Sequence, residues 1–600
     1  MAETAVSVFR ERVERCGDRT AFRVLAAGGA ARDETITWRD WGEAARRFAA
    51  ALVDSGHRPG EAVAVFAGNT PLWPVADLGI LLAGGISVGV YPTSSPEQLR
   101  RLLADSDAVA LVVDTPERLA AATQVRTGAP RLHTVVCERL RPSRTWTLGW
   151  DEWLARGARA LARGPGIADE LERRAARLAP EDTALLIYTS GSTGEPKGAR
   201  VSHRCLLESA RSIRAALGLT ETDTGLSFLP FCHGAERIFG LYTRIVCGME
   251  AGLVADHSRV RDAARAYGPT VFGGLPRFYE KAYETLRAEQ ERAPAEERAR
   301  WERTLELGRE RSRLRQAGEP VPEALEAEWR ESGAPLFERV AALFGGRVRL
   351  ATSGGATLPR EVAEYLDALG LTVLGAYGMT EHLCVAFNRP DRYTLDSSGP
   401  PMPGTELRIA EDGEVRVRRG PMTFDGYHGR PDATRAAFTP DGEWLLTGDL
   451  GEVGDDGCLR ITGRKKELIA LSNGKKVAPL PIEARLVQDP WIGQAMLYGE
   501  GRRFVTALLA LRRPVVEAWA RERGIGDDFP ALLAHAEVVG RVQGAVDRVN
   551  AGLSRPEQVR RWILVERELS AEENELTPTL KLRRPVVADR YRDRMEALYS

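Results

Sequence analysis

Short apolar runs alternate with amphipathic, helix-like stretches through about the first two-thirds of the chain. Examples are residues 62–67, 108–113, 184–188 and 270–272, each followed by polar or helical sequence. Parallel strands need a long crossover connection, which is usually a helix, so this alternation is typical of α/β domains. The pattern therefore predicts an α/β fold with largely parallel sheets.

Two later regions depart from this pattern. Residues 279–338 are charged and rich in Ala, Glu, Arg and Leu, and they predict two or three long surface helices interrupted near 318–322. Because charge-rich helices usually present a solvated face, we expect a surface here rather than a binding site. Residues 404–427 contain short alternating segments, such as 414–417, which predict a small antiparallel β unit.

The last part of the chain is predicted to be a separate domain. A turn-rich stretch, residues 442–463, precedes a final segment of about 135 residues, and 600 residues exceed the usual size of one domain. We therefore predict a large, multi-sheet α/β N-terminal domain of residues 1–463 and a small α+β C-terminal domain of residues 464–600.

Charge and cysteine content narrow the class of protein. The chain carries 83 basic and 84 acidic residues, so no net field draws it to nucleic acid or anionic lipid. Its seven cysteines form no CxxC pair and its eight histidines show no ligand spacing, which favours a reducing compartment. No signal-peptide core opens the sequence, and the longest apolar run, 78–91, is too short and too interrupted by glycine to cross a bilayer. These features predict a globular cytoplasmic protein without an integral membrane segment.

Lysine is rare in this chain. Only seven of the 83 basic residues are lysine, a bias that suggests a GC-rich genome in which lysine persists where arginine cannot replace it. A compact ammonium can enter a crowded phosphate site that a planar guanidinium would not fit. All but Lys281 lie in three short motifs whose other residues also suggest binding or catalysis. These six lysines are Lys197, Lys465, Lys466, Lys475, Lys476 and Lys581.

The strongest motif follows the apolar run 184–187. It reads Tyr-Thr-Ser-Gly-Ser-Thr-Gly-Glu-Pro-Lys-Gly over residues 188–198. Glycines let backbone N–H groups turn toward an anion, hydroxyls add donors, and a lysine adds a charge. The composition predicts a phosphate cradle, but not the common P-loop, because Gly198 stands where that motif needs Ser or Thr. The residues concerned are Thr189, Ser190, Gly191, Ser192, Thr193, Gly194 and Lys197.

With these residues the sequence resembles the adenylate-forming superfamily, which includes acyl-CoA synthetases, peptide-synthetase adenylation domains and luciferases. The resemblance extends over nearly the whole chain, and residues 189–198 match in full the family's signature loop, a Ser/Thr/Gly run closed by Pro-Lys-Gly. It implies that ATP binds this loop, that Lys197 takes part in catalysis, and that the small C-terminal domain is mobile.

A second motif, residues 375–381, reads Gly-Ala-Tyr-Gly-Met-Thr-Glu after the strand-like run 371–374. It offers an aromatic face, a hydroxyl and a carboxylate within a few positions. The resemblance implies that Tyr377 stacks on adenine, Thr380 contacts the α-phosphate and Glu381 holds Mg²⁺, an ion that suits a lone carboxylate plus substrate phosphates. It also assigns to nucleotide binding Gly378 and Met379 and, in an adenine-side loop, Gly354, Gly355 and Ala356.

The C-terminal part of the chain carries the remaining residues implied by the resemblance. An acidic side chain can accept both ribose hydroxyls, and Asp449 matches that role with Arg464 assisting. Lys466 matches the family's catalytic hinge, where a few backbone dihedrals absorb a domain rotation. Residues 472–476 match a glycine loop that lines a thiol tunnel. Lys581 matches the mobile catalytic lysine that bridges the acid and the α-phosphate.

Residues 229–237, Leu-Pro-Phe-Cys-His-Gly-Ala-Glu-Arg, resemble the acid-pocket segment of long-chain members specifically. His233 is expected to border the substrate carboxylate, although a packed core histidine fits the pattern nearly as well. Cys232, His233 and Glu236 make the segment less apolar than a pure fatty-acid tunnel requires. The pocket residues implied in this way are Phe231, His233, Gly234 and Gly375.

Together these features predict an enzyme that uses ATP and Mg²⁺ to activate an acid as its adenylate and then transfers the acyl group, with a long-chain fatty acid and coenzyme A as the first choices. Three alternatives stay open: a pathway-specific ligase for an aryl or other specialised acid, an ATP-dependent diazotase that activates nitrite for an aryl amine, and a non-enzymatic nucleotide-binding module. Lys581 and Glu381 disfavour the last, because holding a nucleotide requires neither. The sequence leaves the final acceptor and the oligomeric state open.

Overall fold

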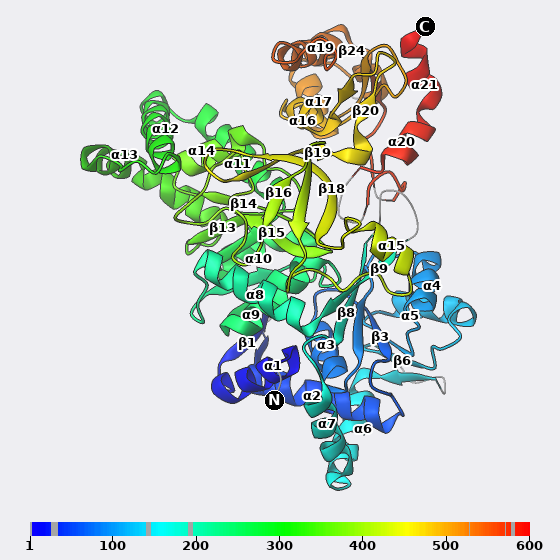
Figure 1. Cartoon of the computed structure of the whole chain (residues 1–600). Helices are drawn as coiled ribbons and strands as arrows, with labels where there is room; N and C mark the ends of the chain where they lie inside the picture. The colour runs from blue at the N-terminus through cyan, green and yellow to red at the C-terminus, as the bar shows by residue number, and fades with distance from the viewer. Residues whose placement is uncertain are drawn as a thin grey trace. The chain divides into compact units, whose positions relative to one another are not determined.

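The computed structural model describes residues 3–25, 34–139, 146–189, 196–526, 528–570, 572–577 and 582–600. Over these ranges the chain forms two compact units (Figure 1). Residues 464–600 all belong to unit 2, and the domain division at residue 463 stays a prediction. Unit 1 comprises Met1–Leu407, Val417–Leu446 and Gly454–Leu459, and unit 2 comprises Arg408–Arg416, Thr447–Val453 and Arg460–Ser600.

The first sheet of unit 1 is largely parallel. Its strand order is β7-β6-β5-β3-β4-β8-β9, and only the β8–β9 pair is antiparallel among the described strands. Strand β3 reads Ala-Val-Ala-Val-Phe and is buried throughout, as expected where helices cover both faces of a parallel sheet. The bounds are β3 Ala62–Phe66, β4 Ile86–Gly89, β5 Ala110–Val113, β6 Thr134–Cys137, β7 Thr147–Gly149, β8 Thr183–Thr189 and β9 Lys197–Ser202.

The second sheet of unit 1 has the order β15-β14-β13-β12-β10-β11-β1-β2. Its interior pairs are parallel, and antiparallel pairs close both ends. The bounds are β1 Thr20–Val24, β2 Glu34–Thr37, β10 Thr224–Ser227, β11 Glu250–Leu253, β12 Val271–Gly274, β13 Leu350–Ser353, β14 Val373–Met379 and β15 His382–Phe387.

The predicted α/β alternation is confirmed. The runs 62–67, 108–113, 184–188 and 270–272 correspond to β3, β5, β8 and β12. Helices separate most successive parallel strands, although no helix lies between β6 and β7 among the described residues. Helix α4 shows why they begin where they do, with a Ser95–Gln98 capping box and a proline at its first helical position. The helices that pack on these sheets include α1 Ala5–Cys16, α2 Trp38–Asp54, α3 Leu72–Leu82, α4 Pro96–Asp105, α8 His203–Leu217, α10 Val260–Tyr267 and α14 Arg360–Ala368.

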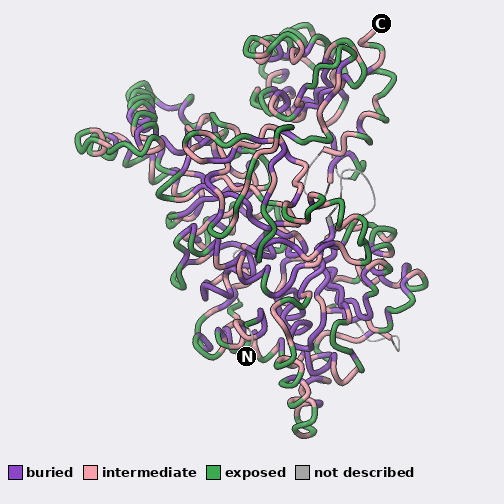
Figure 2. Tube along the Cα trace, viewed as in Figure 1, coloured by how far each residue is buried: buried purple, intermediate pink, exposed green. Residues whose placement is uncertain are grey.

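Three long helices form the charged region of unit 1. They are α11 Pro276–Arg292, α12 Ala295–Gln316 and α13 Glu323–Leu343, and the break predicted near 318–322 separates α12 from α13. Figure 2 shows α12 and α13 as largely exposed, in contrast to the buried strands. Surface ion pairs such as Arg303–Glu328, at 2.6 Å, join them. The prediction of solvated surface helices is confirmed.

A smaller sheet has the order β16-β17-β18-β19, and its second strand contains the predicted segment 414–417. Unit 2 contains the hairpin β20-β21 and the sheet β22-β23-β24. Among the helices of the described ranges, none has the length and apolar content needed to cross a membrane. The bounds are β16 Leu407–Ile409, β17 Glu414–Arg418, β18 Trp444–Val453, β19 Leu459–Arg464, β20 Ile469–Ala470, β21 Lys476–Val477, β22 Ile492–Tyr498, β23 Val505–Leu511, β24 Val559–Val565, α16 Pro479–Leu486, α17 Arg513–Glu522, α18 Phe529–Leu533, α19 Ala536–Asn550, α20 Arg584–Arg590 and α21 Arg592–Glu596.

Candidate functional site

The register of the second sheet brings two predicted motifs to one edge. Gly274, Ser353 and Gly375 lie opposite one another on β12, β13 and β14. The segments that continue from β13 and β14 therefore lie side by side at the carboxyl edge of the strands, where open α/β sheets bind ligands. A Cβ atom placed on Gly354 would lie 3.8 Å from that of Ala376. The predicted adenine-side loop, residues 354–356, is thus adjacent to the 375–381 motif.

The 375–381 motif lies mostly inside a strand, whereas the sequence suggested that it follows one. β14 continues to Met379 because it pairs in antiparallel fashion with the wholly buried, apolar β15. Two glycines are required by close backbone approach. A Cβ on Gly375 would come within 2.9 Å of the Ser397 carbonyl oxygen, and one on Gly378 within 2.4 Å of the Leu383 carbonyl oxygen. Tyr377, between them, is half-buried.

The predicted acid-pocket segment reaches the end of this motif. A Cβ on Gly234 would lie 3.9 Å from Thr380 Oγ1 and 3.2 Å from the side chain of Leu383. The absence of a side chain at residue 234 therefore leaves space directly beside the Thr380 hydroxyl. Two residues that lie far apart in sequence, one predicted to border the acid and one predicted to contact the α-phosphate, are thus neighbours in the structure.

The neighbours of Gly234 have different surroundings. The His233 ring is half-buried, its Nδ1 accepts a hydrogen bond from the Ala235 backbone at 3.1 Å, and its centroid lies 6.4 Å from that of Tyr91. Phe231 is buried and packs on Trp73 with ring centroids 5.3 Å apart. His233 is therefore more exposed than Phe231, and the pocket role of both residues stays a prediction.

The polar residues of this segment face the protein interior. Glu236 begins a π-helix, η2 Glu236–Tyr242, and hydrogen-bonds with Ser227; burial raises the pKa of its carboxyl to about 7. Arg237 is fully buried, forms an ion pair with Asp77 and donates to Ser87 Oγ at 2.8 Å. Inside unit 1 the Arg237 charge is paired with Asp77, although its Nε and Nη1 are buried without a hydrogen-bond partner among the described residues. Polar side chains at residues 236 and 237 therefore give no reason to expect a polar acid pocket.

Lys197 and Glu381 meet at a shared tyrosine. The Lys197 ammonium lies 5.2 Å from the centroid of the Tyr427 ring, and the Tyr427 hydroxyl donates to Glu381 Oε1 at 2.5 Å. Burial, reinforced by the Glu381 charge, raises the pKa of Tyr427, so the phenol remains a donor. Glu381 Oε2 has no hydrogen-bond partner among the described residues, which fits a carboxylate that holds a metal ion.

The chemistry of this donor set fits Mg²⁺. Within the described ranges no group of three or more His, Cys, Asp or Glu side chains could hold a metal ion. A single carboxylate beside a phosphate cradle suits Mg²⁺, which keeps several waters and takes oxygens from substrate phosphates. Of the predicted cradle, Thr189 ends β8 and Lys197 begins β9, opposite each other in register; Ser190, Gly191, Ser192, Thr193 and Gly194 lie outside the described residues.

A hollow of about 230 Å³ is lined by residues from both sides of the predicted phosphate cradle. It is lined by Tyr188 and Pro196, together with Arg100, Arg101 and Arg430. The Tyr188 hydroxyl donates to Asp105 at 2.7 Å, and Arg430 forms an ion pair with the same carboxylate at 3.0 Å. The arginines make this surface suitable for anions next to the predicted phosphate loop.

In unit 2 the two predicted ribose residues form an ion pair. Arg464 Nε lies 3.2 Å from Asp449 Oδ1, and the Asp449 side chain is only 9% exposed against 44% for Arg464. The Asp449 backbone N–H donates to Thr447 Oγ1 at 3.1 Å, and the intervening Gly448 has φ +70°, a conformation that favours glycine. The Thr-Gly-Asp motif therefore lies within β18, and the left-handed conformation of Gly448 separates the Thr447 hydroxyl from the Asp449 carboxylate that pairs with Arg464.

The two lysines at the predicted hinge have different environments. Lys465 Nζ lies 2.6 Å from Asp412 Oδ2 and 3.1 Å from Glu414 Oε2, and its hydrogen bond lowers the pKa of Asp412. Lys466 is exposed and forms no hydrogen bond or ion pair with any described side chain. Its side chain is therefore free of local anchoring, whereas Lys465 is held.

Lys581 lies outside the described residues, but the chain on both sides of it is well anchored. Leu576 and Leu582 form an antiparallel bridge. Glu575 is fully buried and accepts from Arg567 and Arg590, each at 2.7 Å. Arg584 pairs with Glu483 and with Glu467, the latter at 3.2 Å. The Arg584 contact connects the chain after Lys581 to the segment that contains Lys466, and no sequence motif signals it.

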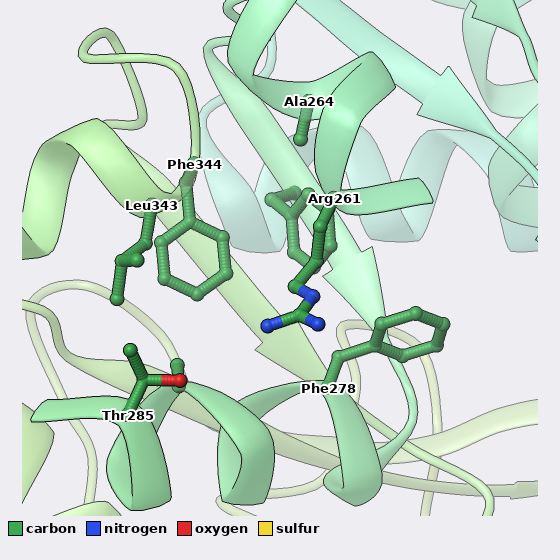
Figure 3. Close-up of a pocket in the computed structure, with 8 residues that line it drawn as sticks. Arg261, Ala264, Phe278, Thr285, Leu343 and Phe344 are labelled. Carbon is green, nitrogen blue, oxygen red and sulfur yellow. The ribbon is translucent and has the colours of Figure 1, made fainter. Parts of the chain in front are cut away.

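An aromatic cavity lies between α10, β12, α11 and α13 (Figure 3). Phe272, Phe278 and Phe344 line it, and the Arg261 guanidinium points into it. Its volume is about 10 Å³, which is room for about one water molecule. Phe278 packs edge-on against Phe228, at 4.9 Å, and so joins this cluster to the segment that leads to Gly234. An acyl chain could enter the cavity only if these side chains moved.

The chain matches known proteins along nearly its whole length. Residues 9–428 match the AMP-binding enzyme family, and residues 466–600 match the AMP-binding enzyme C-terminal domain. The long-chain-fatty-acid–CoA ligase FadD15 of Mycobacterium bovis is 33% identical over 566 residues, which cover 93% of this chain and 92% of that protein. The long-chain-fatty-acid–CoA ligase ACSBG2 of Gallus gallus is 28% identical over 644 residues, covering 100% of this chain and 81% of that one.

Solved structures share the fold at lower identity. The anthranilate CoA ligase AuaEII in complex with anthranoyl-AMP superposes with a TM-score of 0.73 at 20% identity, over 99% of this chain and 98% of that one. The adenylation domain of a carboxylate reductase from Mycobacterium chelonae gives 0.74 at 24% identity, over 100% and 91%. At these identities the likeness concerns the fold alone.

Proposed function

The chain belongs to the AMP-binding enzyme family, and on that premise we propose that it is an AMP-forming ligase that joins a long-chain fatty acid to coenzyme A. The observation that supports the proposal is the proximity of Gly234 to Thr380, because Gly234 belongs to the segment predicted to form the acid pocket and Thr380 is the residue predicted to contact the α-phosphate. Full-length similarity to long-chain-fatty-acid–CoA ligases supports the choice of acid.

In the first half-reaction, a carboxylate oxygen of the acid attacks the α-phosphorus of ATP in line. The new O–P bond forms as the bond to the β-phosphate breaks, and pyrophosphate leaves. Lys197 and the 189–194 loop bind the phosphates, Thr380 contacts the α-phosphate, and Lys581 stabilises the negative charge between acid and phosphate. Mg²⁺ held by Glu381 would supply further charge neutralisation at the phosphates.

Asp449 and Arg464 orient the nucleotide through the ribose. The Asp449 carboxylate is preorganised, since its backbone N–H donates to Thr447 Oγ1 and its charge is paired with Arg464. A carboxylate with two oxygens can accept from both ribose hydroxyls at once. Fixing the ribose limits the orientations that the α-phosphate can adopt. The reactants are then held closer to the geometry of the transition state, which raises the rate of the first half-reaction.

In the second half-reaction, the thiol of coenzyme A attacks the acyl carbon. The C–S bond forms, the bond from the acyl carbon to the AMP oxygen breaks, AMP leaves and the thiol proton passes to solvent. We propose that the C-terminal domain rotates about Lys466 between the two steps, withdrawing Lys581. We also propose that the enzyme is cytoplasmic, a choice supported by seven buried cysteines, none of which forms a disulfide.

The proposed hinge at Lys466 predicts different effects on the two half-reactions. Lys466→Pro should leave acid-dependent ATP–pyrophosphate exchange within a few-fold of wild type but reduce acyl-CoA formation by about 10-fold or more, because proline fixes φ and blocks the rotation. Lys466→Ala is the matched control: it keeps the backbone free, and the side chain has no partner to lose among the described residues. Equal loss of both half-reactions in the proline variant would rule out a hinge role.

The length of the fatty acid chain should control how tightly the enzyme binds the acid. Each buried methylene contributes about 0.8 kcal/mol, so a C16 acid should outcompete a C8 acid in kcat/KM by about 100-fold or more once the aromatic cluster near Phe228 and Phe278 opens around the chain. The measurement is competition between the two acids, with acyl-CoA products resolved by mass. Equal use of both acids, or better use of benzoate or nitrite, would contradict a long-chain substrate.

A further inference from the structure

Residues 425–430 form a strap along β9, next to the predicted phosphate cradle. Tyr427 bridges to Ala199, and the Arg200 backbone N–H donates to the Gly426 carbonyl oxygen at 2.9 Å. The His428 N–H donates to the Gly198 carbonyl oxygen at 2.8 Å. The backbone of Tyr427 is therefore fixed beside the strand that begins at Lys197.

The strap is also held from its other side. The Tyr427 N–H donates to Thr434 Oγ1 at 2.9 Å, and Gly426 has φ +108°. A Cβ at Gly426 would lie 2.5 Å from the Thr434 side chain. The glycine thus lets the chain turn close against Thr434, and the turn fixes the direction in which the next side chain leaves the strap.

From this position the Tyr427 side chain reaches two residues of opposite charge. Its ring lies under the Lys197 ammonium, and its hydroxyl donates to Glu381. Glu381 is held a second time through its backbone, because its carbonyl oxygen accepts from the Phe424 N–H at 2.9 Å. With Oε1 engaged and the backbone pinned, the Glu381 carboxylate has one orientation, and Oε2 is the oxygen left for another ligand.

We propose that Tyr427 is a positioning residue for Mg²⁺ and ATP: its hydroxyl orients the Glu381 carboxylate and its ring holds Lys197 beside the cradle. The inference rests on the proposed function for the roles of Glu381 and Lys197, and adds a residue that no motif of the sequence indicates. Hydrogen-bond partners of metal-ligating carboxylates fix ligand orientation and commonly affect metal affinity by 10- to 100-fold. A cation over an aromatic ring at an exposed position has a smaller effect, about two- to five-fold.

The two functions of the side chain can be separated by substitution. Tyr427→Phe removes the hydroxyl and keeps the ring, whereas Tyr427→Leu removes both. Tyr283→Phe is the matched control, because Tyr283 donates to Glu361 at the same distance of 2.5 Å, between α11 and α14, and neither residue belongs to a predicted motif. A purely structural tyrosine–glutamate bond should behave alike at both places.

The test is direct nucleotide binding, measured by calorimetry with ATP at a series of Mg²⁺ concentrations, with thermal unfolding as a check on folding. We expect Tyr427→Phe to raise the Mg²⁺ concentration for half-maximal ATP binding by about 10-fold and to leave Mg²⁺-free ATP binding near wild type. Tyr427→Leu should in addition weaken Mg²⁺-free ATP binding by about two- to five-fold. Tyr283→Phe should change neither quantity.

The proposal is overturned if Tyr427→Phe leaves the Mg²⁺ concentration for half-maximal ATP binding unchanged or lowers it. An equal change in Tyr283→Phe also overturns it. If Tyr427→Leu fails to fold, the phenylalanine variant alone decides the role of the hydroxyl. Because the readout is binding, it stays informative even if no acid supports turnover by the wild type. Failure of the ligase function and failure of the positioning role are therefore distinguishable.

Discussion

Replacing Lys581 with alanine is expected to lower acid-dependent pyrophosphate release by about 100-fold or more, while ATP binding changes by no more than a few-fold. A charge that acts only in the transition state affects the rate of the chemical step and leaves ground-state binding nearly intact. The chain has only seven lysines, and this one is flanked by a Leu576–Leu582 bridge and by the buried carboxylate of Glu575.

Lys281→Ala is the control for this result. Lys281 is exposed on α11 and lies outside every predicted motif, so its loss should leave pyrophosphate release at the wild-type rate. Lys581→Arg should recover little activity, because a planar guanidinium does not replace a compact ammonium at a crowded phosphate. Wild-type release by Lys581→Ala would remove this residue from the mechanism.

Glu381→Gln should produce the second large effect, on the metal requirement. The amide keeps the size of the side chain but loses the charge that Mg²⁺ prefers, so the Mg²⁺ concentration for half-maximal activity should rise by about 10-fold or more and turnover should fall. The measurement is pyrophosphate release across a Mg²⁺ titration at saturating ATP. Glu361→Gln, which alters a carboxylate with a similar tyrosine partner, serves as the control. An identical titration curve for Glu381→Gln would place the metal elsewhere.

Local features of the fold could be predicted from the sequence. The strands β3, β5, β8 and β12 follow from apolar runs, and the break between α12 and α13 follows from the Gly/Pro-containing stretch near 318–322. Both are properties of a few consecutive residues. The extension of β14 through Tyr377 to Met379 could not be predicted in this way, because it depends on pairing with β15.

The candidate site shows the same limit. The motifs identify Lys197, Thr380 and Glu381 by residue type and resemblance, but the partner that joins two of them, Tyr427, lies 46 positions from Glu381. A single sequence contains no signal for such a contact. Arg584 and Glu467, which are 117 positions apart, are a second example.

Side-chain direction in the acid-pocket segment was also beyond sequence reasoning. Cys232, His233 and Glu236 suggested a more polar pocket. Cys232 and Glu236 are buried in the protein interior, and Glu236 bonds to Ser227, whereas His233 is half-buried. The π-helix that begins at Glu236 changes the angular spacing of the residues that follow, so an α-helical pattern does not give their directions. The objection to an apolar acid therefore has no support at residues 232 and 236.

Acid-dependent ATP–pyrophosphate exchange in the absence of coenzyme A tests the central claim most directly. Labelled pyrophosphate should enter ATP when a C16 fatty acid is present and should not do so without acid, because only a reversible acyl-adenylate step links the two. Addition of coenzyme A should then yield acyl-CoA and AMP in equal amounts. Exchange that is independent of any acid, or ATP cleavage that yields ADP and phosphate, would contradict an adenylate-forming ligase.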